Sequence, residues 1–222
     1  MHASYQKLNL IKNKVNEIIS KKQLKTEPKI IVVSKTFSAD KIIPLIDFGH
    51  IHFGENKIQE AETKWNNLKK IYVNLQLHMI GKLQSNKAKK AVKLFDYIHS
   101  LDSKSLALKI SACEQELKKK VNLFIQVNLA NEPQKSGVLL EELDDFYEYC
   151  VKNLSLNIIG LMCLPPNDLQ SNEYFKLLKE RADKLNLKNL SMGMSSDYED
   201  AIACGSTFIR LGTIILGKRE TI

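Results

Sequence analysis

Lys35 is the residue of this chain best placed to act as a nucleophilic amine. It ends the stretch IIVVSK at 30–35, in which four aliphatic residues predict a buried strand. An ammonium group that is partly desolvated at such a strand end has a lowered pKa, and the neutral amine attacks aldehydes to form a Schiff base. The alternative is an ordinary strand end, where the lysine stem covers apolar surface and the charge stays in water.

A serine-rich turn, SMGMSSDYEDAIACG at 191–205, could bind an anion. Ser196 and Glu199 have capping-box spacing, which predicts a helix that begins after Ser196 and ends at Gly205. Free backbone N–H groups at the helix start, beside the hydroxyls of Ser195 and Ser196, suit a phosphate. A helix that is merely capped would produce the same pattern.

The stretch FIRLGTIILG at 208–217 contributes a fixed cation. Arg210 has the strand parity of Phe208, so both side chains can point to the same side of a sheet. A buried guanidinium stays charged and needs an acceptor, either a ligand or a carboxylate of the protein. Gly212 and Thr213 follow directly and let the backbone approach a ligand.

Eight short apolar runs alternate with amphipathic stretches and must position these groups. Strand–helix alternation predicts parallel strands with right-handed crossovers, and eight such units favour an α/β fold of the TIM-type (β/α)8 barrel class. We expect a single domain over residues 1–222 with an extra N-terminal helix that ends before Pro28. The predicted strands are 29–34, 50–54, 75–81, 95–100, 121–128, 156–162, 189–193 and 206–212, and the predicted helices include 141–152 and 171–186.

In such a barrel the strands end at one face, where catalytic and phosphate sites lie. If Lys35 points into this mouth, Ile31 and Val33 fill the interior, whereas Ile30 and Val32 face the helices. An amine, an anion site and a fixed cation would then meet. Pyridoxal 5'-phosphate (PLP) offers an aldehyde, a phosphate and a pyridine nitrogen, which match them one for one.

Charge and cysteine usage limit the other classes of partner. Lys and Arg exceed Asp and Glu by 33 to 25, a net charge of +8, but the basic clusters at 87–90 and 118–120 lack interleaved aromatic residues, so we expect no nucleic-acid binding. No apolar run is long enough for a membrane span. The four separated cysteines read as reduced thiols, and we expect a cytoplasmic monomer.

Several motifs in order resemble one family along nearly the whole chain. The chain is similar to the pyridoxal phosphate homeostasis proteins (the YggS/PROSC family), which share the barrel of the alanine racemase N-terminal domain. The resemblance implies that Lys35 holds PLP as a Schiff base and that Arg210 approaches its pyridine nitrogen. The motifs are VVSKT at 32–36, FGENKIQE at 53–60, HMIGKLQSNK at 78–87, SGV at 136–138, GLM at 160–162, LSMGMSSD at 190–197 and STFIRLGT at 206–213.

The same resemblance implies further cofactor contacts. Ser195, Gly212 and Thr213 would bind the phosphate, while Asn56 and His78 would line the ring. The chain also departs from the family pattern beside these motifs. Leu77 stands where an aromatic residue is usual, Lys82 where proline is usual and Lys57 where a larger residue such as tyrosine is common; His52 is also unusual, and we expect it at the surface.

The resemblance implies a PLP carrier without turnover. An arginine opposite the pyridine nitrogen keeps that nitrogen unprotonated and weakens the ring as an electron sink. Racemisation needs acid–base groups on both faces of the substrate; alanine racemases take the second from another domain, and we expect Tyr174 and Tyr198 to be packing or surface residues. We therefore expect intracellular PLP homeostasis, in which the protein buffers PLP or delivers it to PLP-dependent apo-enzymes.

Three other functions stay open at this point. A PLP-dependent amino-acid racemase could complete its acid–base pair from a partner chain. A phosphosugar aldolase would use Lys35 as its amine and the serine-rich turn for the phosphate. A basic nucleic-acid module would reveal itself by steeply salt-dependent binding.

Overall fold

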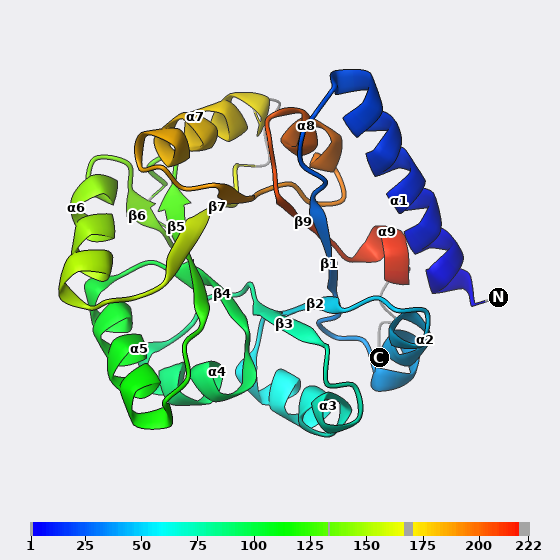
Figure 1. The fold of residues 1–222 in the computed structure, drawn as a ribbon, viewed down its shortest axis with the longest axis horizontal. Coiled ribbons are helices and arrows are strands. Elements are labelled where there is room, and N and C mark those ends of the chain that lie inside the picture. Colours follow the sequence, from blue (N-terminus) through cyan, green and yellow to red (C-terminus); the bar gives the residue numbers. More distant parts are fainter. Residues whose placement is uncertain (1, 133, 167–170, 218–222) are drawn as a thin grey trace.

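A closed barrel of eight parallel strands forms the centre of the computed structural model, which describes residues 2–132, 134–166 and 171–217 (Figure 1). The order β4-β3-β2-β1-β9-β8-β7-β5 closes through pairing of β4 with β5, while the two-residue β6 pairs with β5. The predicted TIM-type (β/α)8 barrel is confirmed, and β6 was not predicted. The strands are β1 Lys29–Val33, β2 His52–Glu55, β3 Gln76–Met79, β4 Tyr97–Leu101, β5 Asn122–Asn128, β6 Val138–Leu139, β7 Ile158–Cys163, β8 Asn189–Ser191 and β9 Phe208–Leu211.

Helices surround the barrel, and the extra N-terminal helix α1 packs outside this ring against α2, α8 and α9. Its stripe of Leu8, Ile11 and Val15 is buried, as the helical spacing predicts. None of the helices in the described ranges is both long and apolar enough to cross a membrane. The helices are α1 Ala3–Lys22, α2 Ala39–Asp47, α3 Ile58–Ile71, α4 Ala88–Leu94, α5 Lys104–Leu117, α6 Leu143–Glu148, α7 Ser171–Lys184, α8 Tyr198–Ala203 and α9 Thr213–Leu216, with a 3-10 turn at Ser85–Lys87 and a π-helix at Tyr149–Asn153.

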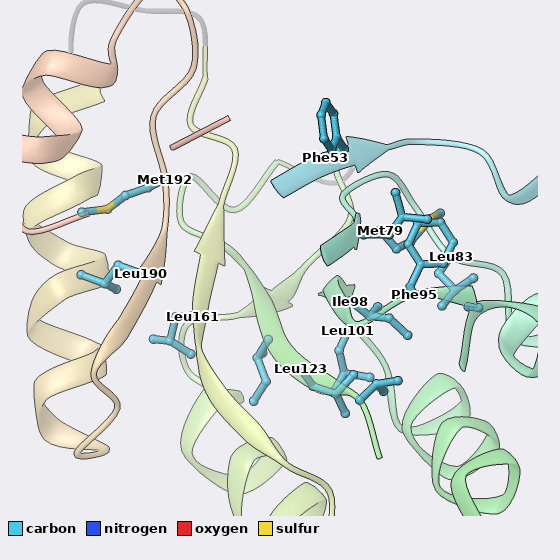
Figure 2. Packing of buried hydrophobic residues seen from close by; sticks show 14 of the residues in the cluster. Phe53, Met79, Leu83, Phe95, Ile98, Leu101, Leu123, Leu161, Leu190 and Met192 are labelled. Carbon is cyan, nitrogen blue, oxygen red and sulfur yellow. The ribbon is translucent and has the colours of Figure 1, made fainter. Parts of the chain in front are cut away.

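The strands separate two apolar layers. Ile31 belongs to a small cluster inside the barrel with Phe124, Met162 and Phe208. Ile30 and Val32 belong instead to the large layer between strands and helices. Figure 2 shows part of this outer layer, with Leu190 and Met192 directed from their strand segment toward the helices. The alternation expected for β1 is therefore confirmed at these three positions, and Val33, two residues closer to the C-terminal end of the strand, has the parity of Ile31.

Candidate functional site

A cavity of about 400 Å³ opens at the C-terminal end of the barrel. This is a volume suited to a small ligand. Amides of Asn56, Gln126 and Asn128 provide polar groups in its wall, and Ile80 and Met194 provide apolar ones. The cavity therefore combines apolar surface with a few convergent polar groups, as ligand sites in proteins do. The full lining is Asn56, Ile80, Gly81, Lys82, Gln126, Val127, Asn128, Lys135, Ser136, Leu164, Pro165 and Met194.

The end of β1 is fixed by a buried carboxylate network. Oε1 of Glu55, which has no exposed surface, accepts hydrogen bonds from Ser34 Oγ at 2.7 Å, Lys64 Nζ at 2.9 Å and Trp65 Nε1 at 2.9 Å. Lys64 Nζ also donates to the Ser34 carbonyl at 2.7 Å. The side chains of β2 and α3 thus hold the backbone immediately before Lys35.

Lys35 itself lies in a tight turn after β1 and is half-buried. Thr36 follows it with a φ of +67°, a left-handed conformation that is rare for a β-branched residue. The Thr36 N–H donates to the Glu60 carboxylate, and the Thr36 hydroxyl donates to the Lys35 carbonyl at 2.6 Å. These bonds hold a strained backbone, which is a recurring property of functional sites.

Arg210 is buried at 4% exposure and points inward from β9. Its Nη1 donates to Ser191 Oγ at 2.7 Å, and its Nη2 donates to the Cys163 carbonyl at 2.8 Å, at the ends of β8 and β7. Burial lowers its pKa. The Asp197 carboxylate acts on this charge through space and raises the pKa in part, while the hydrogen bonds from the guanidinium to described residues go to neutral groups. Two of its five N–H groups make these contacts.

The serine-rich turn lies beside Arg210. Gly193 has a φ of +93°, and its carbonyl accepts the Arg210 N–H at 3.0 Å, which ties the turn to β9. The expected capping box is wrong: α8 begins at Tyr198 with Asp197 as the N-cap and without a side-chain cap bond. The Asp197 carboxylate instead accepts a hydrogen bond from the Met194 N–H at 2.6 Å, because the tight turn at 194–197 brings these two groups within hydrogen-bond distance. Ser195 lies within this turn and is partly buried.

Strand register brings the remaining predicted residues to the same end of the barrel. Val33 pairs with Gly54, and its side chain lies 3.4 Å from the position of a Cβ on Gly212. Gly212 is the N-cap of α9, and the exposed Thr213 is the first residue of that helix. Lys35 and Asn56, each two residues beyond the Val33–Gly54 pair, therefore follow adjacent strand ends.

A close backbone approach fixes Asn56. A Cβ on Gly81 would lie 2.7 Å from the Asn56 Cα, so only glycine fits there. Among the residues predicted to contact the cofactor, only Asn56 belongs to the cavity lining as described. The others lie outside this lining, with Lys35, Ser195 and Gly212 in segments that follow strands, Thr213 at the start of α9 and Arg210 within β9.

His78 lies deeper than the cavity wall. It is fully buried, its ring is stacked on Tyr97 with centroids 4.3 Å apart, and it is hydrogen-bonded to His52 and His99. Two residues further along the chain, Ile80 reaches the cavity. The expectation that His52 is a surface residue is wrong. Its ring is hydrogen-bonded to His78 at the barrel end opposite the mouth and is partly buried there.

Sequence reasoning missed the groups that support the site. The sequence pattern assigned no role to Glu55 and Lys64, nor to His99 and Ser191, which join Arg210 to the buried histidines. Glu55 could have been found from the sequence. It is a carboxylate at a strand position that faces the helices and is buried, and a buried carboxylate needs hydrogen-bond partners.

The fold and the mouth define a class: this chain belongs to the alanine racemase N-terminal domain family, whose model matches residues 7–220. Within that class it belongs to the pyridoxal phosphate homeostasis protein family. The relative of that name from Pasteurella multocida is 35% identical over 202 residues, covering 86% of this chain and 87% of the relative. The one from Escherichia coli K12 is 34% identical over 203 residues, covering 87% of each.

Solved structures agree. PipY of Synechococcus elongatus with PLP bound is 36% identical, with a TM-score of 0.77 over 91% of this chain and 100% of PipY. An alanine racemase from Clostridium difficile has a TM-score of 0.67 at 14% identity, which shows the fold alone, and this chain covers 56% of it.

Proposed function

We propose that this protein binds PLP at the barrel mouth and takes part in intracellular PLP homeostasis. The observation that carries the proposal is the buried Arg210, whose guanidinium donates to the neutral Ser191 hydroxyl and Cys163 carbonyl. A phosphorylated ring with an electron-rich nitrogen suits such a cation better than a neutral ligand does. The names of the relatives and the PLP held by PipY support the same ligand.

The chain has a group for each end of the ring. PLP supplies an electrophilic aldehyde when bound, and the half-buried Lys35 amine would hold it covalently as a Schiff base. The network around Ser34 and Glu55 keeps the backbone of Lys35 in place. Arg210 would donate one of its further N–H groups to the ring nitrogen.

The remaining proposed contacts would come from segments beyond the strand ends and from the barrel interior. Ser195, Gly212 and Thr213, in the turn before α8 and at the start of α9, would bind the phosphate through hydroxyl and backbone N–H groups. Asn56 would line the ring from the cavity wall, and His78 would support it from the barrel interior.

We further propose that binding occurs without turnover. A guanidinium that donates to the ring nitrogen keeps this nitrogen unprotonated, and an unprotonated ring is a poor electron sink. Residues 1–222 would then act as a single cytoplasmic, monomeric PLP-binding domain that buffers PLP or hands it to PLP-dependent apo-enzymes.

The test of binding compares two lysine variants. Wild-type protein mixed with PLP is expected to show the visible absorbance of lysine-bound cofactor, and borohydride reduction should fix it to the peptide that contains Lys35. Lys35→Ala should lose both properties. Lys57→Ala is the matched control, since Lys57 is exposed beside Asn56, and it should retain both. A Lys35→Ala protein that still traps PLP at this site would overturn the assignment.

The test of turnover uses the loaded protein. Incubation with a panel of single-enantiomer amino acids, followed by chiral chromatography, should show no inversion above that of free PLP. Inversion that depends on Lys35 would establish a racemase in place of a carrier.

A further inference from the structure

A chain of four side-chain hydrogen bonds crosses the inside of the barrel from Arg210. Arg210 Nη1 bonds to Ser191 Oγ at 2.7 Å, and Ser191 Oγ bonds to His99 Nδ1 at 2.8 Å. His99 Nε2 bonds to His78 Nδ1 at 2.9 Å, and His78 Nε2 bonds to His52 Nδ1 at 3.0 Å. The chain links five strands and ends at the first residue of β2, at the opposite end of the barrel from the mouth.

Aromatic packing fixes the two central imidazoles. His99 is stacked on Phe124 with ring centroids 4.3 Å apart, and Phe208 lies against both histidines at 5.9–6.0 Å. Both imidazoles are completely buried, so a change of tautomer cannot be compensated by water at the ring surface.

All three histidines are neutral at physiological pH. Burial lowers the pKa of His78 and His99 well below the ordinary value, with the Arg210 charge acting in the same direction on His99. Burial also lowers the pKa of His52 to about 4. A neutral imidazole has one donor nitrogen and one acceptor nitrogen, so every ring in the chain must accept on one side and donate on the other.

Arg210 determines the direction of the chain because a guanidinium can only donate. Ser191 Oγ therefore accepts a hydrogen bond from it. Within this series of five side chains, the Ser191 hydroxyl proton can be donated only to His99 Nδ1. His99 then donates from Nε2 to His78. By the same rule His78 donates from Nε2 to His52, and His52 keeps its own proton on Nε2.

The opposite direction is disfavoured on two grounds. It would leave the buried Ser191 hydroxyl proton without an acceptor among these five side chains, which costs the desolvation free energy of that hydroxyl. It would also turn the positive ends of the imidazole dipoles toward the Arg210 charge.

We propose that Arg210, Ser191, His99, His78 and His52 form one directional relay that positions Arg210 and turns neutral dipoles toward its charge. The negative ends of the dipoles point at the guanidinium, and bonds in such a chain strengthen one another. The charge therefore stays available to a ligand at the mouth. Ser191 and His99 are positioning residues in this arrangement, and the effect on ligand binding rests on the proposed function.

The direction of the relay is tested without a ligand. Two-bond nitrogen–proton NMR on protein labelled with ¹⁵N-histidine separates the two neutral tautomers of each ring. At pH 7.5, His99, His78 and His52 should all carry the proton on Nε2. A proton on Nδ1 of His99 or His78 in the wild type overturns the relay, whether or not the protein binds PLP.

Three serine variants test positioning. Ser191→Ala should release the His99 tautomer and weaken PLP binding by about tenfold, the effect of losing one hydrogen bond to a charged group. Ser191→Thr keeps the hydroxyl and should restore both. Ser206→Ala removes another buried hydroxyl, which donates to the Met192 carbonyl at 2.7 Å, and should leave the tautomers and PLP affinity as in the wild type.

The outcomes separate the two proposals. If the wild type binds PLP, and Ser191→Ala binds it equally well with unchanged tautomers, the relay is refuted and the proposed function stands. If the wild type binds no PLP but its tautomers are as described, the proposed function fails and the relay stands.

Discussion

Acid should destabilise this protein well before its carboxylates titrate, because several histidines are buried in the neutral form. His50 is the clearest case. It is 6% exposed, its Nε2–H donates to the His52 carbonyl at 2.9 Å, and burial lowers its pKa from 6.5 to about 4. As the pH falls through 6.5 the unfolded chain binds a proton at this position, whereas the folded chain binds it only near pH 4. Unfolding is therefore favoured increasingly across that interval.

The size of the effect follows from the two pKa values. A histidine with a pKa of 6.5 when unfolded and about 4 when folded loses about 2 kcal/mol of folding free energy between pH 7 and pH 5. His78 and His99 act in the same direction. The free energy of unfolding of the wild type should thus fall by at least about 2 kcal/mol over this range, which is a large part of the stability of an ordinary domain.

Urea unfolding at pH 7 and pH 5 measures this loss. Trp65, the single tryptophan, is fully buried on α3 and reports unfolding by fluorescence. His50→Gln keeps a donor for the His52 carbonyl but cannot bind a proton, so its loss between the two pH values should be about 2 kcal/mol smaller than that of the wild type. His2→Gln changes the exposed histidine at the N-cap of α1 and serves as the control, since its loss of stability between the two pH values should match that of the wild type.

Two results would refute this reasoning. One is a wild-type stability that is the same at pH 5 and pH 7 with an unchanged dependence on urea concentration. The other is an equal loss in the wild type and in His50→Gln, which would place the acid sensitivity elsewhere in the chain.

The network behind the mouth and the turn beside Arg210 give two further predictions. Glu55→Gln removes the carboxylate charge beside the buried Lys64 ammonium and should lower the free energy of unfolding by about 3 kcal/mol. Glu62→Gln, at an exposed ion pair, should lower it by less than about 1 kcal/mol. Equal losses in urea unfolding would contradict this prediction. Gly193→Ala adds a methyl group 2.6 Å from a neighbouring one at a positive φ and should cost about 3 kcal/mol, against about 1 kcal/mol for Gly205→Ala, where only the backbone conformation is strained. Thermal unfolding of the two alanine variants measures the difference, and a Gly205→Ala loss as large as that of Gly193→Ala would contradict it.

Local sequence pattern predicted the eight strands of the barrel and the place of Lys35 after the first of them. The strand from Lys29 to Val33 is recognisable because consecutive aliphatic residues are what a parallel strand buried on both faces requires. The alternation of side chains then places Ile31 inside and Arg210 beside Phe208, since the two-residue period of a strand needs no knowledge of its neighbours. These properties depend on residues within a few positions of one another.

Only the tertiary structure decided which polar groups meet. Ser191 and His99 are 92 residues apart, and Glu55 is 21 residues from Ser34, so their hydrogen bonds depend on strand register and barrel closure. The same is true of the pairing of β4 with β5 that closes the sheet. A one-residue change of register would reverse every side chain of a strand, and no local pattern specifies that register for a histidine or a glutamate. The sequence therefore drew attention to Lys35 and Arg210, while closure of the barrel determined the buried groups that contact Arg210 and the backbone before Lys35.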